Sequence, residues 1–282
     1  MTFQTTFRVV EVQPDVKLRA EISFPAEATP EDALTDTTLV LLHFWGGSSS
    51  TWAQVRSLLA PKYPVVALDF RGWGQSTGPD DESAYSIAHL ADDVELVIRA
   101  LGLRSFVLMG HSMGAKVAQL VAGRKHADGL LGLVLVSPAP PSPLELPPEM
   151  REQQVHAYDT PESAEFVTRN VLTASPLQQG TVDRVVTDML KGNNHAKAAW
   201  PAYGMGSDIV AEAKRVDVPT LVVGAEGDVV EPVARIEREV RGVISHSELV
   251  IAPDSGHLVP VEAPEELGKA TSKFLKGLLG HR

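Results

Sequence analysis

The stretch Gly110-His111-Ser112-Met113-Gly114 follows the apolar run 106–109 and precedes a helix-prone segment, 115–123. A strand that turns sharply into a helix through G-x-S-x-G is typical of a nucleophile elbow, which exposes its serine at the tip of the turn. Glycines suit this turn because a Cβ at either position would crowd the neighbouring strand or helix. The N-terminus of the helix favours negative charge that develops beside the serine. The pattern therefore predicts that Ser112 is a nucleophile.

Apolar runs on both sides of the elbow predict the rest of a sheet. Continuous runs of this kind suit strands that are covered on both faces, and helical patterns separate them. The strands are expected at 38–42, 65–68, 106–109, 131–136, 220–223 and 248–251, and the helices at 51–59, 87–101, 112–124, 231–240 and 264–278. Strands that alternate with helices indicate βαβ units and a parallel sheet.

The start of the chain adds an antiparallel pair of strands, 5–12 and 16–23, around Pro14-Asp15. The segment 25–37 is polar and is expected to be a surface loop. The sequence thus predicts an α/β fold with a doubly wound, mostly parallel sheet of about eight strands.

The interval 138–208 breaks the alternation, because it contains no run that suits a buried strand. It opens with a proline-rich exit from the preceding strand. Short helical patterns follow at 148–156, 161–172, 179–190 and 195–200. The interval is either a separate helical subdomain or a lid inserted above the carboxyl ends of the strands. Because the strand pattern resumes at Val218, we expect a helical lid (cap) at 138–208 inserted into a core domain formed by 1–137 and 209–282.

Composition and charge exclude several classes of function. The chain has 282 residues, no cysteine and a formal net charge of -11. This charge disfavours nucleic acid and anionic membranes as partners, since both would repel it. Without cysteine there is no disulfide framework, thiol nucleophile or thiolate metal site. No apolar run approaches the roughly 20 residues of a membrane span, and residues 1–10 lack the features of a signal peptide, so we expect a cytoplasmic protein.

A serine hydroxyl needs a base to accept its proton, and the base needs an orienting group. In a doubly wound sheet, ligands bind at the carboxyl ends of the strands. His257 lies in the loop after the last predicted strand, and Asp228 lies in the loop after the strand before it. The order Ser112, Asp228, His257 is the order expected when the nucleophile elbow comes first. We therefore predict His257 as general base and Asp228 as the acid that orients it.

Two other carboxylates compete with Asp228 for this role. Glu226 and Asp254 also follow strands, and each carboxylate of the three would otherwise cap a turn or the next helix. Asp228 is preferred because it lies in the loop rather than at the strand tip. The chain has no H-E-x-x-H motif and no group of histidines and carboxylates with ligand spacing. We therefore expect neither a metal nor another cofactor.

Two backbone donors are expected to stabilise the oxyanion. One is the N–H of Met113, the residue after the nucleophile. The other should come from the loop 43–48, where Trp45 is the expected donor.

Three side chains near these donors are expected to have a structural role or to line the substrate pocket. Phe44 is expected either to line the acyl pocket or to pack in the core. His43 is expected to form a hydrogen bond beside the site. His111 is expected to be structural, with its side chain pointing away from the site.

Together these motifs resemble the α/β-hydrolase fold superfamily, in its capped single-domain branch of small esterases, lactonases, epoxide hydrolases and cofactor-free haloperoxidases. The resemblance covers nearly the whole chain and is weakest in 138–208. It is carried by the elbow 110–114, the loop that begins at His43, the stretch Asp69-Phe70-Arg71-Gly72-Trp73-Gly74-Gln75-Ser76, the loop 224–228 and Gly256-His257. It implies the nucleophile Ser112, the acid Asp228, the base His257 and the oxyanion donors Trp45 and Met113.

One position departs from the family pattern. Members usually have His-Gly at the start of the oxyanion loop, whereas this chain has His43-Phe44. Glycine tolerates backbone angles that phenylalanine disfavours. Either the backbone of this loop bends differently here, with Gly46-Gly47 supplying the conformational freedom, or the usual φ and ψ angles at this position are compatible with a side chain.

The sequence therefore predicts a serine hydrolase that cleaves a carboxylic ester or lactone through an acyl-enzyme on Ser112. A cofactor-free perhydrolase or haloperoxidase-like activity and C–C bond hydrolysis are alternatives that use the same three residues. An alternative of another class is a ligand receptor with slow turnover. The expected partner is a small, mostly apolar substrate. The side chains expected to line its pocket, or to form the core of the lid, are Trp200, Tyr203 and Met205, with Tyr158, Phe166 and Met189.

Overall fold

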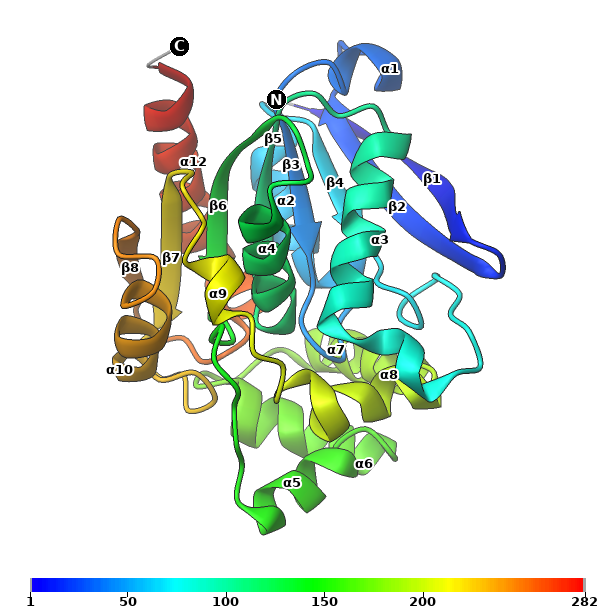
Figure 1. Cartoon of the computed structure of the whole chain (residues 1–282), viewed down its shortest axis with the longest axis vertical. Helices are drawn as coiled ribbons and strands as arrows, with labels where there is room; N and C mark the ends of the chain where they lie inside the picture. The colour runs from blue at the N-terminus through cyan, green and yellow to red at the C-terminus, as the bar shows by residue number, and fades with distance from the viewer. Residues whose placement is uncertain (1, 281–282) are drawn as a thin grey trace.

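A computed structural model describes residues 2–280, and within this range eight strands form one sheet (Figure 1). Their order in the sheet is β1-β2-β4-β3-β5-β6-β7-β8. The strands are β1 (Phe3–Gln13), β2 (Val16–Pro25), β3 (Thr38–Leu42), β4 (Val65–Leu68), β5 (Phe106–His111), β6 (Leu130–Val136), β7 (Thr220–Ala225) and β8 (Glu248–Ala252). The predicted α/β fold with a mostly parallel sheet of eight strands is confirmed.

The direction of the strands divides the sheet into two parts. β1 pairs antiparallel with β2, and β2 pairs antiparallel with β4. All pairs from β4 to β8 are parallel. The parallel strands therefore place their carboxyl ends, and the loops that follow them, along one edge of the sheet.

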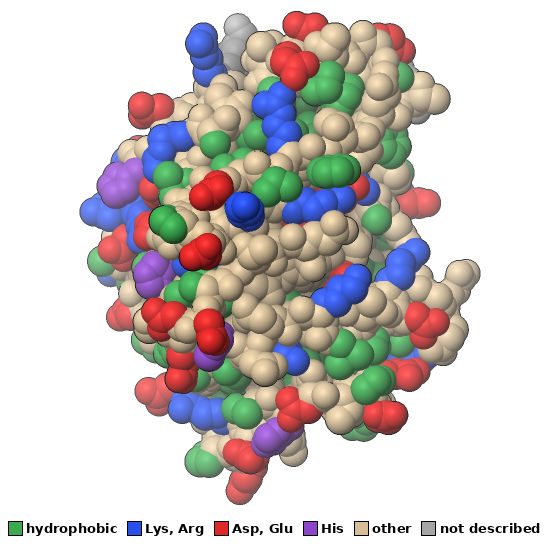
Figure 2. Space-filling view, turned by 90° about the vertical axis from the view of Figure 1, so that its right-hand side faces the viewer, with side chains coloured by type: hydrophobic (Ala, Val, Ile, Leu, Met, Phe, Trp, Pro, Cys, Tyr) green, Lys and Arg blue, Asp and Glu red, His purple; other side chains and the backbone are tan. Residues whose placement is uncertain are grey.

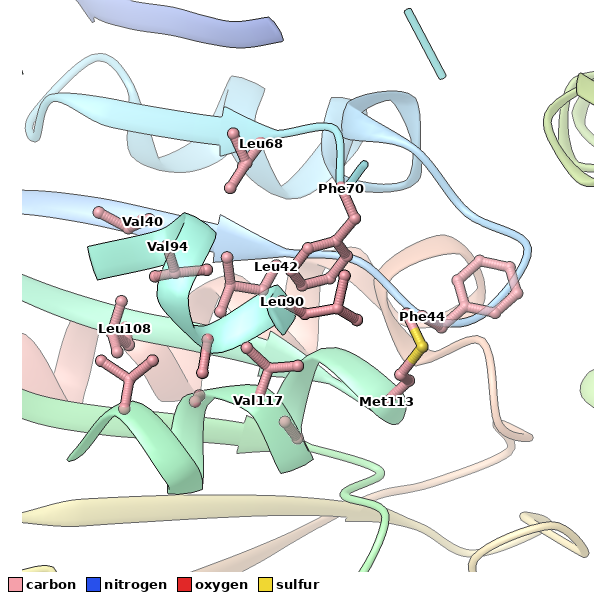
Figure 3. Close-up of a cluster of buried hydrophobic side chains, with 14 of the residues drawn as sticks. Val40, Leu42, Phe44, Leu68, Phe70, Leu90, Val94, Leu108, Met113 and Val117 are labelled. Carbon is pink, nitrogen blue, oxygen red and sulfur yellow. The ribbon is translucent and has the colours of Figure 1, made fainter. Parts of the chain in front are cut away.

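Two layers of helices cover the sheet (Figure 1). The main helices are α2 (Ala53–Leu59), α3 (Ile87–Ala100), α4 (Met113–Arg124) and α12 (Pro264–Gly280). α3 and α4 pack together on one face, and α2 and α12 pack together on the other. Successive side chains of a strand point to opposite faces. Val40 and Leu42 of β3 accordingly join the core beneath α3 and α4 (Figure 3), while Leu39 and Leu41 join the core on the α2 side.

The interval between β6 and β7 is helical and lies beyond the carboxyl ends of the strands (Figure 1). We call residues 138–208 the helical insertion. Its elements are α5 (Pro148–Val155), α6 (Pro161–Val167), η3 (Thr168–Leu172), α7 (Gln179–Lys191), α8 (Asn194–Ala199) and η4 (Trp200–Gly204). The two ends of the insertion lie side by side, since Leu144 N–H donates to Met205 C=O at 2.9 Å and Ile209 N–H donates to Pro141 C=O at 2.9 Å.

Several local expectations need correction. The predicted loop 25–37 contains a short helix, α1 (Pro30–Ala33), because Thr29 caps it and Pro30 suits the first helical position. The predicted helix 231–240 begins later, as α10 (Val233–Arg235), and continues as a π-helical turn, η5 (Ile236–Arg241). The predicted helix 51–59 begins as a 3₁₀ turn, η1 (Ser49–Trp52).

β8 also differs from the expected buried strand. It lies at the edge of the sheet, and Val250 and Ile251 remain 40% and 38% exposed. An apolar run alone does not distinguish a central strand from an edge strand.

The surface carries charge of both signs. Acidic and basic side chains are interspersed over the face in Figure 2, with hydrophobic side chains scattered among them. Within residues 2–280, the helices are too short or too polar to cross a membrane.

Candidate active site

Ser112 lies at the turn between β5 and α4, where the backbone is strained. Its φ of 54° and ψ of -115° fall in a region that residues with a side chain rarely adopt, at a cost on the order of 1–3 kcal/mol. A Cβ at Gly110 would lie 2.3 Å from Gly114 C=O, and a Cβ at Gly114 would lie 2.4 Å from Leu42 C=O. The two glycines therefore allow β3, β5 and α4 to approach closely around the serine, as the sequence predicts.

Asp228 and His257 meet below the surface. His257 Nδ1 lies 2.9 Å from Asp228 Oδ2, and both side chains are buried. The second carboxylate oxygen, Oδ1, accepts the N–H groups of Val230 and Glu231 at 2.9 and 2.8 Å. With Nδ1–H donating to Asp228, Nε2 of His257 is the unprotonated nitrogen that a general base needs.

The charges of this pair stabilise each other. Burial opposes ionisation of Asp228, but the His257 charge and hydrogen bond, together with the Glu231 N–H, hold its pKa below the usual range. Burial likewise lowers the pKa of His257, but Asp228, Glu231 and Glu262 outweigh this effect and raise it. The site is therefore arranged to stabilise an imidazolium ion.

Ser112, the predicted nucleophile, is adjacent in sequence to His111, which contacts this pair. His111 Nε2 donates to the C=O of His257 at 2.8 Å, and the two imidazole rings are 5.2 Å apart. The expectation that His111 points away from the site is therefore wrong, because its ring reaches the loop after β8. The hydrogen bonds of residues 2–280 do not include one between Ser112 Oγ and His257 Nε2. Such contacts often tighten only when substrate is bound.

The loop after β3, residues 43–48, forms a tight turn, and we call it the oxyanion loop after the role predicted for Trp45. Gly47 N–H donates to Phe44 C=O at 3.0 Å, and Gly46 has a φ of 95°. A positive φ at the third position alone defines a type II turn. Phe44 is not among the residues of the described chain that have positive φ. Gly46 thus supplies the backbone freedom for the turn. Family members usually have a glycine where this chain has Phe44, and the positive φ of Gly46 allows the bulky Phe44 side chain here.

His43 fixes the peptide that carries the Trp45 N–H. Phe70 N–H donates to His43 Nε2 at 3.0 Å, so Nδ1 carries the proton and donates to Phe44 C=O at 2.7 Å. Burial lowers the pKa of His43, which keeps the ring neutral. Because the peptide is trans, the Trp45 N–H points to the side opposite this anchored carbonyl.

The other predicted donor, Met113, is the first residue of α4. Its N–H therefore has no partner within the helix. The Met113 side chain lies with Phe44 at the end of the core beyond Leu42 and Phe70 (Figure 3). The Met113 N–H therefore makes no hydrogen bond within α4, and the positive end of the α4 dipole lies beside Ser112.

The competing carboxylates and the predicted pocket residues lie in different surroundings. Glu226 and Asp254 are exposed, unlike Asp228.

Trp200 is buried, whereas Tyr203 donates its hydroxyl to Glu82 C=O at 2.6 Å on an exposed side of the insertion. Met205 is buried near the end of the insertion. Trp200 lines a small cavity together with Met113, whereas Tyr203 and Met205 form contacts that hold the insertion to the core.

Two small cavities border the predicted donors. One, of about 20 Å³, is lined by Phe44, Gly47 and Asp188 among others. The second, of about 10 Å³, is lined by Met113 and Trp200 among others. A single water needs roughly 10–15 Å³, so an ester enters either space only if the surrounding side chains move.

Sequence reasoning missed a partly buried carboxylate, Glu262, that holds the His257 loop. Glu262 Oε2 accepts Gly256 N–H at 2.9 Å, and Oε1 accepts the N–H groups of Ala174 and Ser175 at 2.8 and 3.0 Å. The glutamate therefore ties the loop before His257 to the helical insertion. Two of its three partners are backbone groups 87 and 88 residues away, so no local motif indicates the contact with the insertion.

Glu231 is a second carboxylate that the sequence did not single out. It is 2% exposed and lies three residues after Asp228. Burial raises its pKa to about 7, although the charges of His257 and Arg235 act in the opposite direction. It therefore adds a titratable group to the surroundings of His257.

Comparisons with known proteins agree with this architecture. A Bacillus subtilis protein named as a 2-succinyl-6-hydroxy-2,4-cyclohexadiene-1-carboxylate synthase is 28% identical over 85% of this chain and 90% of its own length. A bifunctional esterase/perhydrolase of Acinetobacter calcoaceticus is 27% identical over 83% of this chain and 90% of its own length. The structure of an esterase from Exiguobacterium antarcticum superposes with a TM-score of 0.84, at 18% identity, over 96% of this chain and 100% of that one.

Most of the chain matches one protein family. Residues 37–264 match the family described as the α/β hydrolase fold. The matched region runs from the start of β3 to the beginning of α12 and includes Ser112, Asp228 and His257. The chain therefore belongs to the α/β-hydrolase fold family.

Proposed function

We propose that the protein is a serine hydrolase that cleaves a small, mostly apolar carboxylic ester or lactone. The observation that carries the proposal is the buried hydrogen bond between His257 Nδ1 and Asp228 Oδ2 beside the strained Ser112 elbow. A neutral imidazole with a free Nε2 and a buried carboxylate on Nδ1 suits removal of a serine proton. Relatives named as an esterase/perhydrolase and solved esterases support the reaction class.

Acylation follows from these positions. Ser112 Oγ attacks the substrate carbonyl carbon while its proton passes to His257 Nε2. The π electrons of the carbonyl bond move to its oxygen, and the resulting oxyanion accepts hydrogen bonds from the N–H groups of Trp45 and Met113. Such a donor typically contributes about 3 kcal/mol to the transition state. When the oxyanion collapses, the bond to the leaving oxygen breaks, and His257 Nε2–H protonates that oxygen. Asp228 stabilises the imidazolium throughout.

Deacylation repeats the same steps with water. His257 accepts a proton from the water that attacks the acyl carbon, and the same two donors stabilise the second oxyanion. Collapse breaks the bond to Ser112 Oγ, which regains its proton from His257. The carboxylic acid leaves and the free enzyme is restored.

A perhydrolase activity is a second candidate, favoured by the esterase/perhydrolase relative. Hydrogen peroxide would replace water in the attack on the acyl-enzyme. The product would then be a peracid, while the roles of Ser112, His257 and Asp228 stay the same.

The test is hydrolysis of p-nitrophenyl esters of graded acyl length and of simple lactones, each with and without peroxide. We expect the native protein to release the acid from at least one apolar member of the panel. Ser112→Ala should lower kcat by at least about 10⁴-fold, because only binding and the oxyanion donors would remain.

Ser83→Ala is the matched control, because Ser83 is exposed and its hydroxyl only donates to Asp81 Oδ1 at 2.8 Å. It should hydrolyse the panel at the native rate. Failure of the native protein on every ester and lactone would contradict the proposed reaction, and a Ser112→Ala variant of native activity would contradict the nucleophile.

A further inference from the structure

We propose that the helical insertion positions the oxyanion loop, with Tyr158 and Asp188 as positioning residues for the Trp45 N–H. The inference rests on the proposed function, in which that N–H stabilises the oxyanion. It assigns the insertion a part in the chemical step, in addition to any part in choosing the substrate.

Three separate pieces of the insertion hold the oxyanion loop. Tyr158, between α5 and α6, donates its hydroxyl to Trp45 C=O at 2.9 Å. From α8, Lys197 C=O accepts the Trp45 indole N–H at 3.0 Å. From α7, Asp188 accepts the Ser48 hydroxyl at 2.8 Å and the Ser50 hydroxyl as well. The insertion therefore binds the loop at its backbone and at its side chains.

The Tyr158 bond falls on the peptide whose orientation defines the turn. Type I and type II turns differ by a flip of the central peptide, here the one between Trp45 and Gly46. Gly46, with its φ of 95°, can adopt either orientation at little steric cost. The hydroxyl of Tyr158 holds Trp45 C=O on one side and so selects the type II form. His43 fixes the preceding peptide through Phe44 C=O, so both peptides of Trp45 are held.

On the Tyr158 side, packing leaves the oxyanion loop no room to relax while the insertion is in place. Tyr158 is 3% exposed, and its ring lies 4.1 Å from the ring of Trp45. A Cβ at Gly46 would lie 2.6 Å from the Tyr158 ring and 2.8 Å from its hydroxyl oxygen. Burial raises the pKa of the Tyr158 hydroxyl, which is therefore protonated and a hydrogen-bond donor at neutral pH.

Asp188 couples the loop to the insertion in a second way. It is buried, and among residues 2–280 its carboxylate forms no ion pair. A buried charge without a cation needs hydrogen-bond donors, which the Ser48 and Ser50 hydroxyls supply. Any separation of the insertion from the core would expose Asp188 to water and break the contacts of both serines and Trp45 together.

The experiment compares Tyr158→Phe with the native protein on one ester that the native protein hydrolyses. Tyr158→Phe keeps the ring and removes only the hydroxyl. We expect kcat to fall about tenfold, while KM changes by less than about threefold, because an oxyanion donor acts on the transition state rather than on the bound substrate. Asp188→Asn should also lower kcat, as Tyr158→Phe does.

A trifluoromethyl ketone inhibitor separates this effect from simple loosening of the pocket. Its adduct with Ser112 carries an oxyanion, so its Ki should rise by the same factor by which kcat/KM falls in Tyr158→Phe. The Ki of the carboxylate product, which binds without forming a tetrahedral adduct, should stay unchanged.

Asp80→Ala is the matched control. Asp80 Oδ1 lies 2.7 Å from His195 Nε2 of α8, so this change also removes a contact between the insertion and the core, but away from the oxyanion loop. It should leave kcat and the ketone Ki at native values. A folded Tyr158→Phe variant with native kcat, or one in which the ketone and product Ki values rise equally, would overturn the inference. Absence of hydrolysis by the native protein would instead contradict the proposed function.

Discussion

At the scale of single residues, the charges around His257 determine when it can act as a base. Asp228 donates no proton in the proposed mechanism, yet it accepts three hydrogen bonds, from His257, Val230 and Glu231. These bonds keep it ionised and keep the imidazole in the tautomer that exposes Nε2. Glu231, buried next to this pair, adds a carboxylate that titrates near neutral pH.

The pH dependence of kcat/KM follows from these charges. Only neutral His257 accepts the Ser112 proton, and its pKa is raised in the folded protein, so activity should rise with pH through a midpoint above about 6.5. Glu231→Gln removes one carboxylate that raises this pKa, so the midpoint should move to lower pH. Glu226→Gln is the control, because Glu226 is exposed in the same loop. A midpoint that stays in place or moves upward in Glu231→Gln would contradict this assignment.

At the scale of elements, α4 connects the proposed nucleophile to both ends of the helical insertion. Ser112 lies at its N-terminus, and Ala139 N–H donates to Ser112 C=O at 3.3 Å. One turn further, the Lys116 ammonium donates to the carbonyls of Ser142 and Met205 at 3.2 and 3.3 Å. Burial lowers the pKa of Lys116 to about 8. A single helix therefore supports the serine and anchors the insertion.

Close packing of α4 against β3 makes a specific prediction for Gly114→Ala. The added Cβ would meet the backbone carbonyls of Leu42 and His43 at 2.4 and 2.6 Å, and backbone atoms cannot swing aside. We expect a loss of roughly 1–3 kcal/mol in the free energy of unfolding, measured by urea denaturation. Gly277→Ala in α12 is the control, because nothing lies within 4 Å of its added Cβ. It should be neutral or stabilising by up to about 1 kcal/mol. Equal stabilities of the two variants would contradict the packing argument.

Elements with a strong local pattern were predictable from the sequence, and contacts between distant elements were not. The predicted strand at 38–42 coincides with β3 because a continuous apolar run records burial on both faces. The exposure of β8 depends on its place at the sheet edge, which the run 248–251 does not encode. The contact of His111 with His257 likewise spans 146 residues and depends on the order of the strands. The roles of Ser112, Asp228 and His257 stay predictions that geometry supports.

At the scale of the whole molecule, the parallel sheet gathers the site along one edge. The oxyanion loop follows β3, Ser112 follows β5, and Asp228 and His257 follow β7 and β8. The helical insertion lies beyond the same edge (Figure 1) and contacts the oxyanion loop through Tyr158 and the His257 loop through Leu172, whose C=O accepts Leu258 N–H at 3.0 Å. Core and insertion therefore enclose the proposed nucleophile together.

The central claim is that Ser112 is the nucleophile activated by His257. Its most direct test is reaction of the protein with a fluorophosphonate, followed by tandem mass spectrometry of the tryptic peptide 105–116, which contains Ser105 and Ser112. We predict one phosphonyl group, on Ser112 Oγ, and a labelling rate that falls by orders of magnitude in His257→Ala. An unmodified Ser112, or a rate that does not change in His257→Ala, would contradict the account.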